Sequence, residues 1–184
     1  MSRSRLLVAF APLVLAVPAN AQNAPPAPPK PAPALVEAFK GMEGTWACTG
    51  SMDNPTKPGS RLTTKSEMKI APEVDGFAYS GSLKIEKNSM MPAGGKAHFH
   101  WGYDTAKQKL IEFGFDNGGN SWSGTSDGLK DGSVVWIEEG AMMGQTAKSR
   151  TSVTIKSPRE ITVVGELDDK GAWRKNEEIH CKKK

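Results

Sequence analysis

The stretch Gly44-Thr45-Trp46-Ala47-Cys48 separates two different hydrophobic patterns in this chain. Before it, apolar residues recur at the spacing of a helix, and glycines end the pattern: Leu35, Val36, Phe39 and Met42, then Gly41 and Gly44. After it, apolar and polar residues alternate with a period of two as far as the C-terminus. We therefore expect a short helix, then a first strand that begins at Gly44, and only strands after that.

Segments of alternation follow one another, and short stretches rich in Gly, Asp, Asn and Pro separate them, as is typical of turns. The segments are residues 62–70, 77–85, 97–103, 109–116, 121–126, 133–139, 146–156, 161–167 and 173–181. Together with the first strand they make about ten short strands in sequential order. We therefore predict an all-β fold, an up-and-down antiparallel barrel of about ten strands with a short N-terminal helix.

The N-terminus has the features of a secretory signal peptide. Arg3 and Arg5 precede an apolar run, and Ala19 and Ala21 form the small-x-small pattern at which such peptides are cleaved. The apolar run is short and contains Pro12, so it does not suit a membrane anchor. We predict a signal peptide at residues 1–21, a Pro/Ala-rich linker at 22–34 and a barrel domain at 35–184, in a periplasmic or secreted protein with no membrane span after cleavage.

The charge of the chain does not indicate a nucleic-acid partner. The predicted leader holds two of the 24 basic residues and none of the 20 acidic ones, which leaves a net charge of +2. Three of the remaining basic residues are the C-terminal lysines 182–184. The basic character therefore comes mainly from the two ends of the chain and not from a basic face.

The chain has two cysteines, Cys48 in the first predicted strand and Cys181 in the last. In a closed barrel of sequential strands the first and last strands are neighbours, so a disulfide can join these two residues where the barrel closes. The alternative is two separate thiols. If the disulfide forms, Cys181 points inward and the adjacent His180 points outward.

Small or hydroxyl residues occupy the middle of several predicted inward faces: Thr64, Ser66, Gly81, Ser149, Thr151 and Gly165. A barrel of this size encloses more volume than such side chains fill, which indicates a cavity with a partly polar lining. The residues expected to line it are Met68, Phe77, Tyr79, Trp101 and Phe113. The alternative is a core filled by large side chains that reach across from other strands.

The Gly44-x-Trp46 motif, after a short helix and before a series of strands, resembles the calycin group, which comprises the lipocalins and their relatives. A longer pattern resembles a bacterial family of exported domains of unknown function: Gly44-Thr45-Trp46 with Cys48 and Gly50, Trp101-Gly102-Tyr103-Asp104, Phe115-Asp116-Asn117-Gly118, and Glu177-Glu178 leading to Cys181. The resemblance implies a lipocalin-like barrel in which Trp46 closes the base. It also implies that a basic residue of the last strand, Arg174 or Lys175, packs over the Trp46 ring.

A related barrel family, the nitrobindins, holds haem through a histidine on a late strand, and His180 lies at the corresponding place. His98 and His100 lie two apart on one strand face, a spacing that can present two imidazoles to a metal. The opposite face, which carries Trp101, is the expected core, so the preferred interpretation leaves both histidines facing solvent.

The pattern from Gly124 to Gly128 matches the Gly-x-Ser-x-Gly signature of serine hydrolases around Ser126. That signature belongs to a strand-to-helix turn in a parallel sheet, and here it falls at a hairpin turn, so no catalytic residues are assigned. We expect non-catalytic binding of a small, mainly apolar ligand inside the barrel. The alternatives are a structural or protein-interaction module with a filled core, and a haem- or metal-binding barrel.

Overall fold

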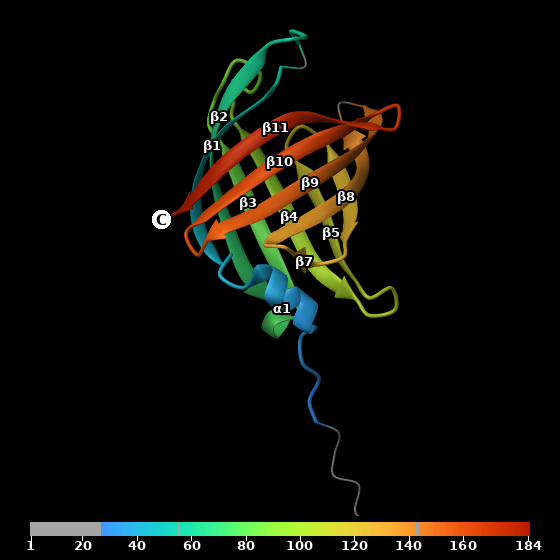
Figure 1. The fold of residues 1–184 in the computed structure, drawn as a ribbon. Helices are drawn as coiled ribbons and strands as arrows, with labels where there is room; N and C mark the ends of the chain where they lie inside the picture. The colour runs from blue at the N-terminus through green and yellow to red at the C-terminus, as the bar shows by residue number, and fades with distance from the viewer. Residues whose placement is uncertain (1–26, 55, 143) are drawn as a thin grey trace, which may run out of the picture.

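The computed structural model describes residues 27–184 except 55 and 143, and the predicted signal peptide lies outside this part of the chain. One short helix precedes the strands (Figure 1). The elements are α1 (Pro33–Phe39), β1 (Gly44–Asp53), β2 (Arg61–Glu73), the 3₁₀ turn η1 (Val74–Gly76), β3 (Ala78–Ile85), β4 (Gly95–Asp104), β5 (Lys109–Asp116), β6 (Ser121–Ser126), β7 (Leu129–Lys130), β8 (Ser133–Met142), β9 (Gln145–Ser157), β10 (Glu160–Asp169) and β11 (Ala172–Lys183).

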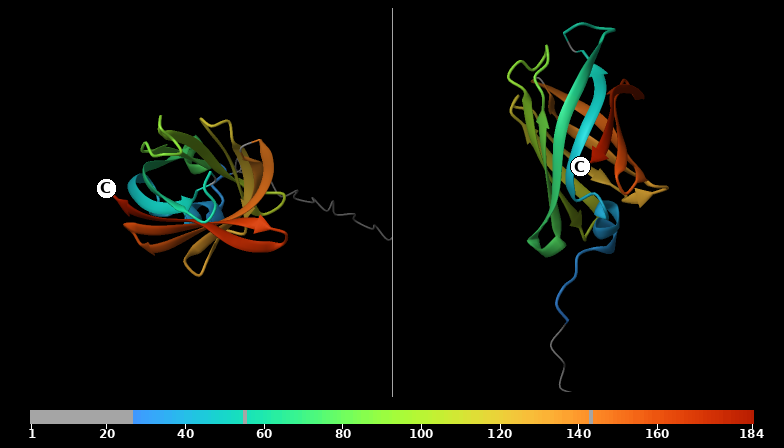
Figure 2. Two further views of the ribbon diagram at one scale, coloured as in Figure 1. Left: turned by 90° about the horizontal axis from the view of Figure 1, so that it is seen from above. Right: turned by 90° about the vertical axis from the view of Figure 1, so that its left-hand side faces the viewer.

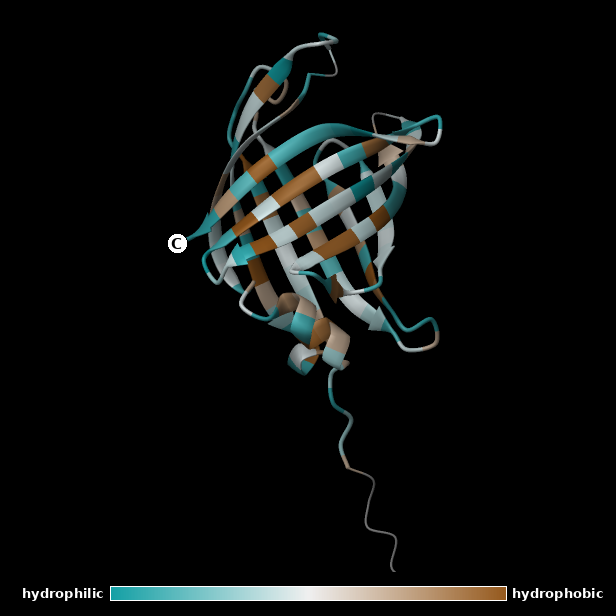
Figure 3. Cartoon of the chain, in the orientation of Figure 1, coloured by the Kyte–Doolittle hydropathy of each residue, from teal (hydrophilic) through white to brown (hydrophobic). Residues whose placement is uncertain are grey.

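The strands form a closed antiparallel barrel, which confirms the predicted fold class. Each strand pairs with the next in sequence, except that the two-residue β7 pairs only with β8, and β6 pairs with β8 directly. The pairing of β1 with β11 closes a barrel of ten strands. The view from above shows the strands arranged in a closed ring (Figure 2). Colouring by hydropathy shows the alternation of apolar and polar residues along the strands (Figure 3).

The helix α1 covers one end of the barrel. Pro33 is at its start, where the missing N–H costs nothing. The helix begins two residues before the expected domain boundary at residue 35. Its buried face carries Leu35 and Phe39, and the Phe39 ring stacks on Tyr79 with centroids 4.5 Å apart. Gly41, which follows the helix with φ of 80°, turns the chain toward β1 at little steric cost.

Trp46 joins this end of the barrel to the last strand. Its side chain is 1% exposed, and its Nε1–H donates to the Met42 carbonyl oxygen at 2.8 Å. The cation above its ring is Lys183, whose Nζ lies 5.5 Å from the ring centroid and donates to the Gly41 carbonyl at 2.9 Å. The strand register explains why Lys183 lies over this ring, because Lys183 is the residue of β11 that faces Trp46.

The expectation that Arg174 or Lys175 would lie over Trp46 is wrong. Arg174 lies at the opposite end of β11, where it forms an ion pair with Asp53. Lys175 pairs with Glu178 on its own strand. The predicted basic residue therefore exists, but it comes from the end of the strand that lies beside α1.

Cys48 and Cys181 form a disulfide across the closing strand pair. They face each other in the β1–β11 register at a sequence separation of 133, and both side chains point into the barrel. A cross-link that closes so long a loop lowers the entropy of the unfolded chain. The disulfide therefore holds together the two strands whose pairing closes the barrel.

Replacing both cysteines, as C48A/C181A, is expected to lower the free energy of unfolding by about 3 to 5 kcal/mol, because the unfolded chain regains the entropy of that loop. Urea unfolding of the variant and of the wild type measures the difference. A reducing agent should destabilise the wild type and leave the variant unchanged. Equal stability of the two proteins would contradict this role of the disulfide.

Candidate functional site

The barrel encloses a cavity of about 310 Å³. It reaches from Phe39 of α1 at one end to the β5–β6 and β8–β9 turns at the other, where Asn120 and Met142 border it. This volume lies at the lower end of the range for pockets that bind small molecules. Apolar lining residues come from nearly every strand and include Met68, Leu83, Phe99, Trp101, Trp122, Val134, Trp136, Val153, Ile161, Val163 and Ile179.

Aromatic side chains form one wall of the cavity. Phe99 and Trp101 lie parallel with centroids 5.6 Å apart, and Trp122 meets Phe99 edge-on at 5.4 Å. Glycines make room for the two indoles. A Cβ atom added at Gly81 would lie 2.5 Å from the Trp101 ring, and one added at Gly114 would lie 2.3 Å from the Trp122 ring. Close approach of backbone and ring thus requires glycine at both positions.

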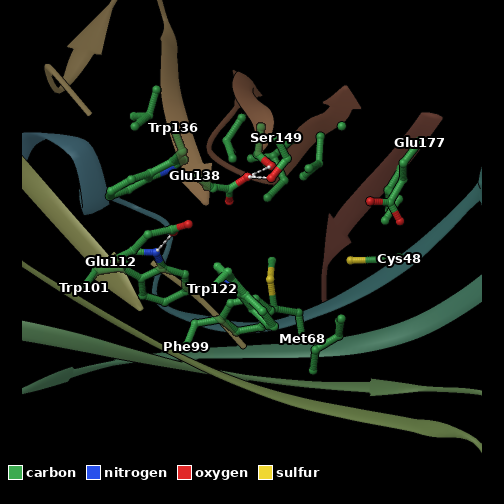
Figure 4. A pocket seen from close by; sticks show the side chains of 18 of the residues that line it. Cys48, Met68, Phe99, Trp101, Glu112, Trp122, Trp136, Glu138, Ser149 and Glu177 are labelled. Atoms are coloured by element: carbon green, nitrogen blue, oxygen red, sulfur yellow. Dashed lines mark hydrogen bonds between the residues drawn. The ribbon is translucent and has the colours of Figure 1, made fainter. Parts of the chain in front are cut away.

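A pair of glutamates, Glu112 on β5 and Glu138 on β8, points into the same cavity (Figure 4). Only Gly124 of β6 separates them, because Gly124 faces Glu112 on one side and Glu138 on the other. A Cβ atom added there would lie 2.9 Å from Cγ of Glu138 and 3.3 Å from Cγ of Glu112. The absence of a side chain at this position lets the two carboxyl groups converge.

The two carboxyl groups have different partners. Glu138 Oε2 accepts hydrogen bonds from Ser149 Oγ at 2.9 Å and from Thr151 Oγ1 at 2.8 Å. Glu112 Oε2 accepts one from Trp101 Nε1 at 2.8 Å. The other oxygen, Glu112 Oε1, is buried and receives no hydrogen bond from an N–H or hydroxyl group of the described residues. When one of the two carboxyl groups is protonated, Glu112 and Glu138 hydrogen-bond to each other. The side chain that carries it is 94% buried, since the residue is only 6% exposed.

Burial raises the pKa of Glu112 well above its ordinary value of 4.5, and the nearby Glu138 carboxyl raises it further. The Trp101 hydrogen bond acts in the opposite direction but is the weakest of these influences. Glu177 of β11 also lines the cavity, and burial raises its pKa, with a smaller contribution from the Glu138 charge. Figure 4 shows its side chain among those that line the cavity.

The structure places the five predicted lining residues in three different environments. Met68 and Trp101 line the cavity. Tyr79 is buried at the helix end against Phe39 and does not border the space. Phe77 precedes β3 and is exposed, and Phe113 is 53% exposed on the outer face of β5. The prediction is therefore wrong for Tyr79, Phe77 and Phe113, none of which lines the cavity.

The error on β5 has a simple cause. Ile111, Phe113 and Phe115 form the more apolar of its two alternating sets, yet they face outward. The inner set consists of Leu110, Glu112, Gly114 and Asp116. Hydropathy alone selects the wrong face of β5, because the inner face carries a glutamate and a glycine.

Of the small mid-strand residues that suggested a cavity, four border it: Ser66, Ser149, Thr151 and Gly165. Gly81 instead has the Trp101 ring packed against it, and Thr64 is buried. The sequence alone did not indicate that Trp122, Trp136, Glu112, Glu138 and Glu177 line the cavity. Glu112 lies in the polar set of a regular alternation along β5, so the sequence pattern assigned it to the outer face.

The three histidines lie on the outside of the barrel. His98 and His100 stack on the outward rings of Phe115 and Phe113, with centroids 5.8 and 4.9 Å apart. His180 is exposed beside Glu178 and Thr162. No histidine lines the cavity, so these residues do not fit a haem iron held inside the barrel. Within residues 27–184, apart from 55 and 143, no group of three or more His, Cys, Asp or Glu side chains is arranged to hold a metal ion.

Ser126 of the hydrolase-like pattern is buried at the end of β6. Its Oγ accepts a hydrogen bond from the Gly128 N–H at 3.2 Å, which is a local turn contact. The neighbouring Gly124 makes room for the two glutamates. The residues of this pattern therefore have structural roles, in a turn and in the wall of the cavity.

Three comparisons with known proteins give a match in structure and none in sequence. No family model and no curated protein matches the chain. The crystal structure of Rv2717c from M. tuberculosis superposes with a TM-score of 0.60 at 10% identity and covers 84% of this chain and 99% of that one. This likeness shows a calycin-like barrel and concerns the fold alone.

Two designed barrels have a lower structural similarity. The redesigned barrel b11L5F_LGL has a TM-score of 0.42 at 14% identity and covers 80% of this chain and 96% of its own. EF1p2_mFAP2b bound to DFHBI also has a TM-score of 0.42, at 11% identity, and covers 82% of this chain and 99% of its own. Similarity at this level adds nothing to the assignment.

The raised pKa of Glu112 predicts a pH-dependent contribution to stability. The folded protein keeps a proton on Glu112 that the unfolded chain releases above its ordinary pKa of 4.5. Stability from this residue is therefore full below about pH 4.5 and falls as the pH rises toward the folded pKa. Glu112→Gln removes this loss, so the stability of E112Q relative to the wild type should increase with pH.

Urea unfolding at a series of pH values measures this difference. Glu139→Gln is the matched control, because Glu139 adjoins Glu138 on β8 but is exposed on the outer face. A difference between E112Q and the wild type that stays constant from pH 4 to pH 8, or one that E139Q reproduces, would contradict the assignment.

Proposed function

We propose that this barrel binds a small, mainly apolar molecule in its cavity and does so without catalysis. The observation that carries the proposal is the cavity of about 310 Å³ behind α1, with an aromatic wall, a mainly apolar lining and a group of carboxyl, amide and hydroxyl side chains. Such a combination is typical of small-molecule sites. It favours ligand binding over a structural or interaction module with a filled core.

The expected setting of this function is outside the cytoplasm. We infer that the chain belongs to the bacterial family of exported domains that its motifs resemble, and that it is periplasmic or secreted. The disulfide supports this inference, because such bonds persist in oxidising compartments. Among the residues that the structure describes, no helix is long and apolar enough to cross a membrane.

Export predicts a defined mature N-terminus. Cleavage after Ala21 leaves Gln22 as the first residue, and mass measurement of the protein made in its own cells tests this. An intact Met1 with both cysteines reduced would contradict export.

The binding proposal is tested with N-phenyl-1-naphthylamine, an uncharged dye whose fluorescence rises in apolar surroundings. We expect saturable binding to the wild type. Val163 of β10 lines the cavity, and Val163→Trp places a large side chain in that space. This variant should weaken binding of the dye at least about tenfold, which corresponds to about 1.4 kcal/mol.

Val164→Trp is the matched control, because Val164 is the next residue on β10, is not part of the lining and points to the other face. It should bind the dye like the wild type. Circular dichroism checks that both variants are folded. Equal loss in both variants, or no saturable binding to the wild type, would contradict binding inside the barrel.

A further inference from the structure

Most of the acidic side chains of the cavity form no ion pair in the described part of the chain. The lining includes five acidic residues and no lysine, arginine or histidine: Glu112, Asp116, Glu138, Glu166 and Glu177. One of the five has a cationic partner, and Asp116 is held by backbone hydrogen bonds. Arg150 pairs with Glu166 at 2.6 Å, and Asp116 accepts hydrogen bonds from the Gly118 and Asn120 N–H groups.

The other three, Glu112, Glu138 and Glu177, form no ion pair in the described part of the chain. Buried carboxyl groups without a cation are costly unless they take up a proton or gain a partner. The three therefore give the cavity a strong preference for positive charge.

Two buried acceptor atoms in the lining also receive no hydrogen bond from an N–H or hydroxyl group of the described residues. They are Glu112 Oε1 and Asn176 Oδ1. No donor atom of the lining is unpartnered in the same way within the described residues. An unsatisfied buried acceptor is unfavourable, so a ligand that donates hydrogen bonds gains affinity here, whereas one that only accepts them does not.

Two indole side chains lie close to the Glu112 carboxyl group (Figure 4). Trp101 is the direct cross-strand neighbour of Glu112, and Trp136 lies two residues before Glu138 on the same inward face of β8. Figure 4 shows both indoles beside the Glu112 carboxyl group. The face of an indole attracts a cation, and the attraction is stronger where water is excluded. A carboxyl group between aromatic rings is thus suited to an ammonium group.

We propose that the ligand of this cavity is an aromatic or aliphatic amine, whose ammonium group binds Glu112 Oε1 between Trp101 and Trp136 while its apolar body fills the space toward Val163 and Ile179. This inference rests on the proposed function and names the ligand class. Glu138, which faces Glu112 across Gly124, adds a second negative group to the site. Burial raises the pKa of Glu112, so a bound ammonium group compensates for the cost of ionising this carboxyl group.

The test compares three probes with one naphthalene body: 1-naphthylmethylamine, 1-naphthalenemethanol and 1-naphthoic acid. Each is titrated at neutral pH against the wild type with bound N-phenyl-1-naphthylamine, and displacement of the dye gives the affinity. We expect the amine to bind at least about tenfold more tightly than the alcohol, and the acid to bind most weakly.

The variant Glu112→Gln removes the carboxylate and keeps the shape of the side chain. The ratio of amine to alcohol affinity should fall close to one in E112Q. The control Glu139→Gln removes the same charge from the outer face of β8 and should keep the wild-type ratio. If E112Q does not fold, the order of the three probes on the wild type decides the question alone.

The outcomes separate this inference from the proposed function. Dye binding that V163W abolishes, together with equal affinities for amine and alcohol or tighter binding of the acid, overturns the amine assignment and leaves ligand binding in place. Absence of dye binding and of probe binding overturns both. A preference for the amine that E139Q removes as well would assign the effect to general surface charge and overturn the role of Glu112.

Discussion

The pairing of β1 with β11 is the constraint on which the rest of this structure depends. Without it the sheet has two open edges and no interior. The disulfide between Cys48 and Cys181 lies within this pairing, and the contact of Lys183 with Trp46 and Gly41 ties its end to the segment beside α1. Closure divides every strand into an inner and an outer face, and the cavity exists because of that division.

Glycines at three positions make room for the side chains inside the barrel. Gly81 and Gly114 allow the Trp101 and Trp122 rings to lie flat against neighbouring strands, and Gly124 lets Glu112 and Glu138 approach each other. The aromatic wall and the paired carboxyl groups thus have the same structural origin. In each case a glycine leaves room for a large or charged side chain on the neighbouring strand. Two neighbouring buried glutamates are unfavourable in an ordinary packed core, because their burial is costly. In the wall of a cavity they suit the proposed binding of a cation or of a ligand that donates hydrogen bonds.

The sequence was sufficient for the architecture because strand alternation, turn residues and sequential order are local features. The helix, the ten barrel strands, the disulfide and the outward orientation of His98 and His100 all follow from such features. The identity of the side chains that line the cavity does not follow from local features, because it depends on the register between strands.

Two cases show this limit. The register places Lys183 rather than Arg174 over Trp46. On β5, the face with Phe113 is the more apolar one, yet it lies on the outside, and the face with Glu112 borders the cavity. Neither outcome can be derived from one strand alone.

The most direct test of the account is a crystal structure of the wild-type protein with 1-naphthylmethylamine bound. The account predicts electron density for the naphthalene rings inside the barrel, with the amine nitrogen within hydrogen-bond distance of Glu112 Oε1 and beside the Trp101 and Trp136 rings. Density only on the outer face of β5, or a nitrogen directed away from the glutamates, would contradict it.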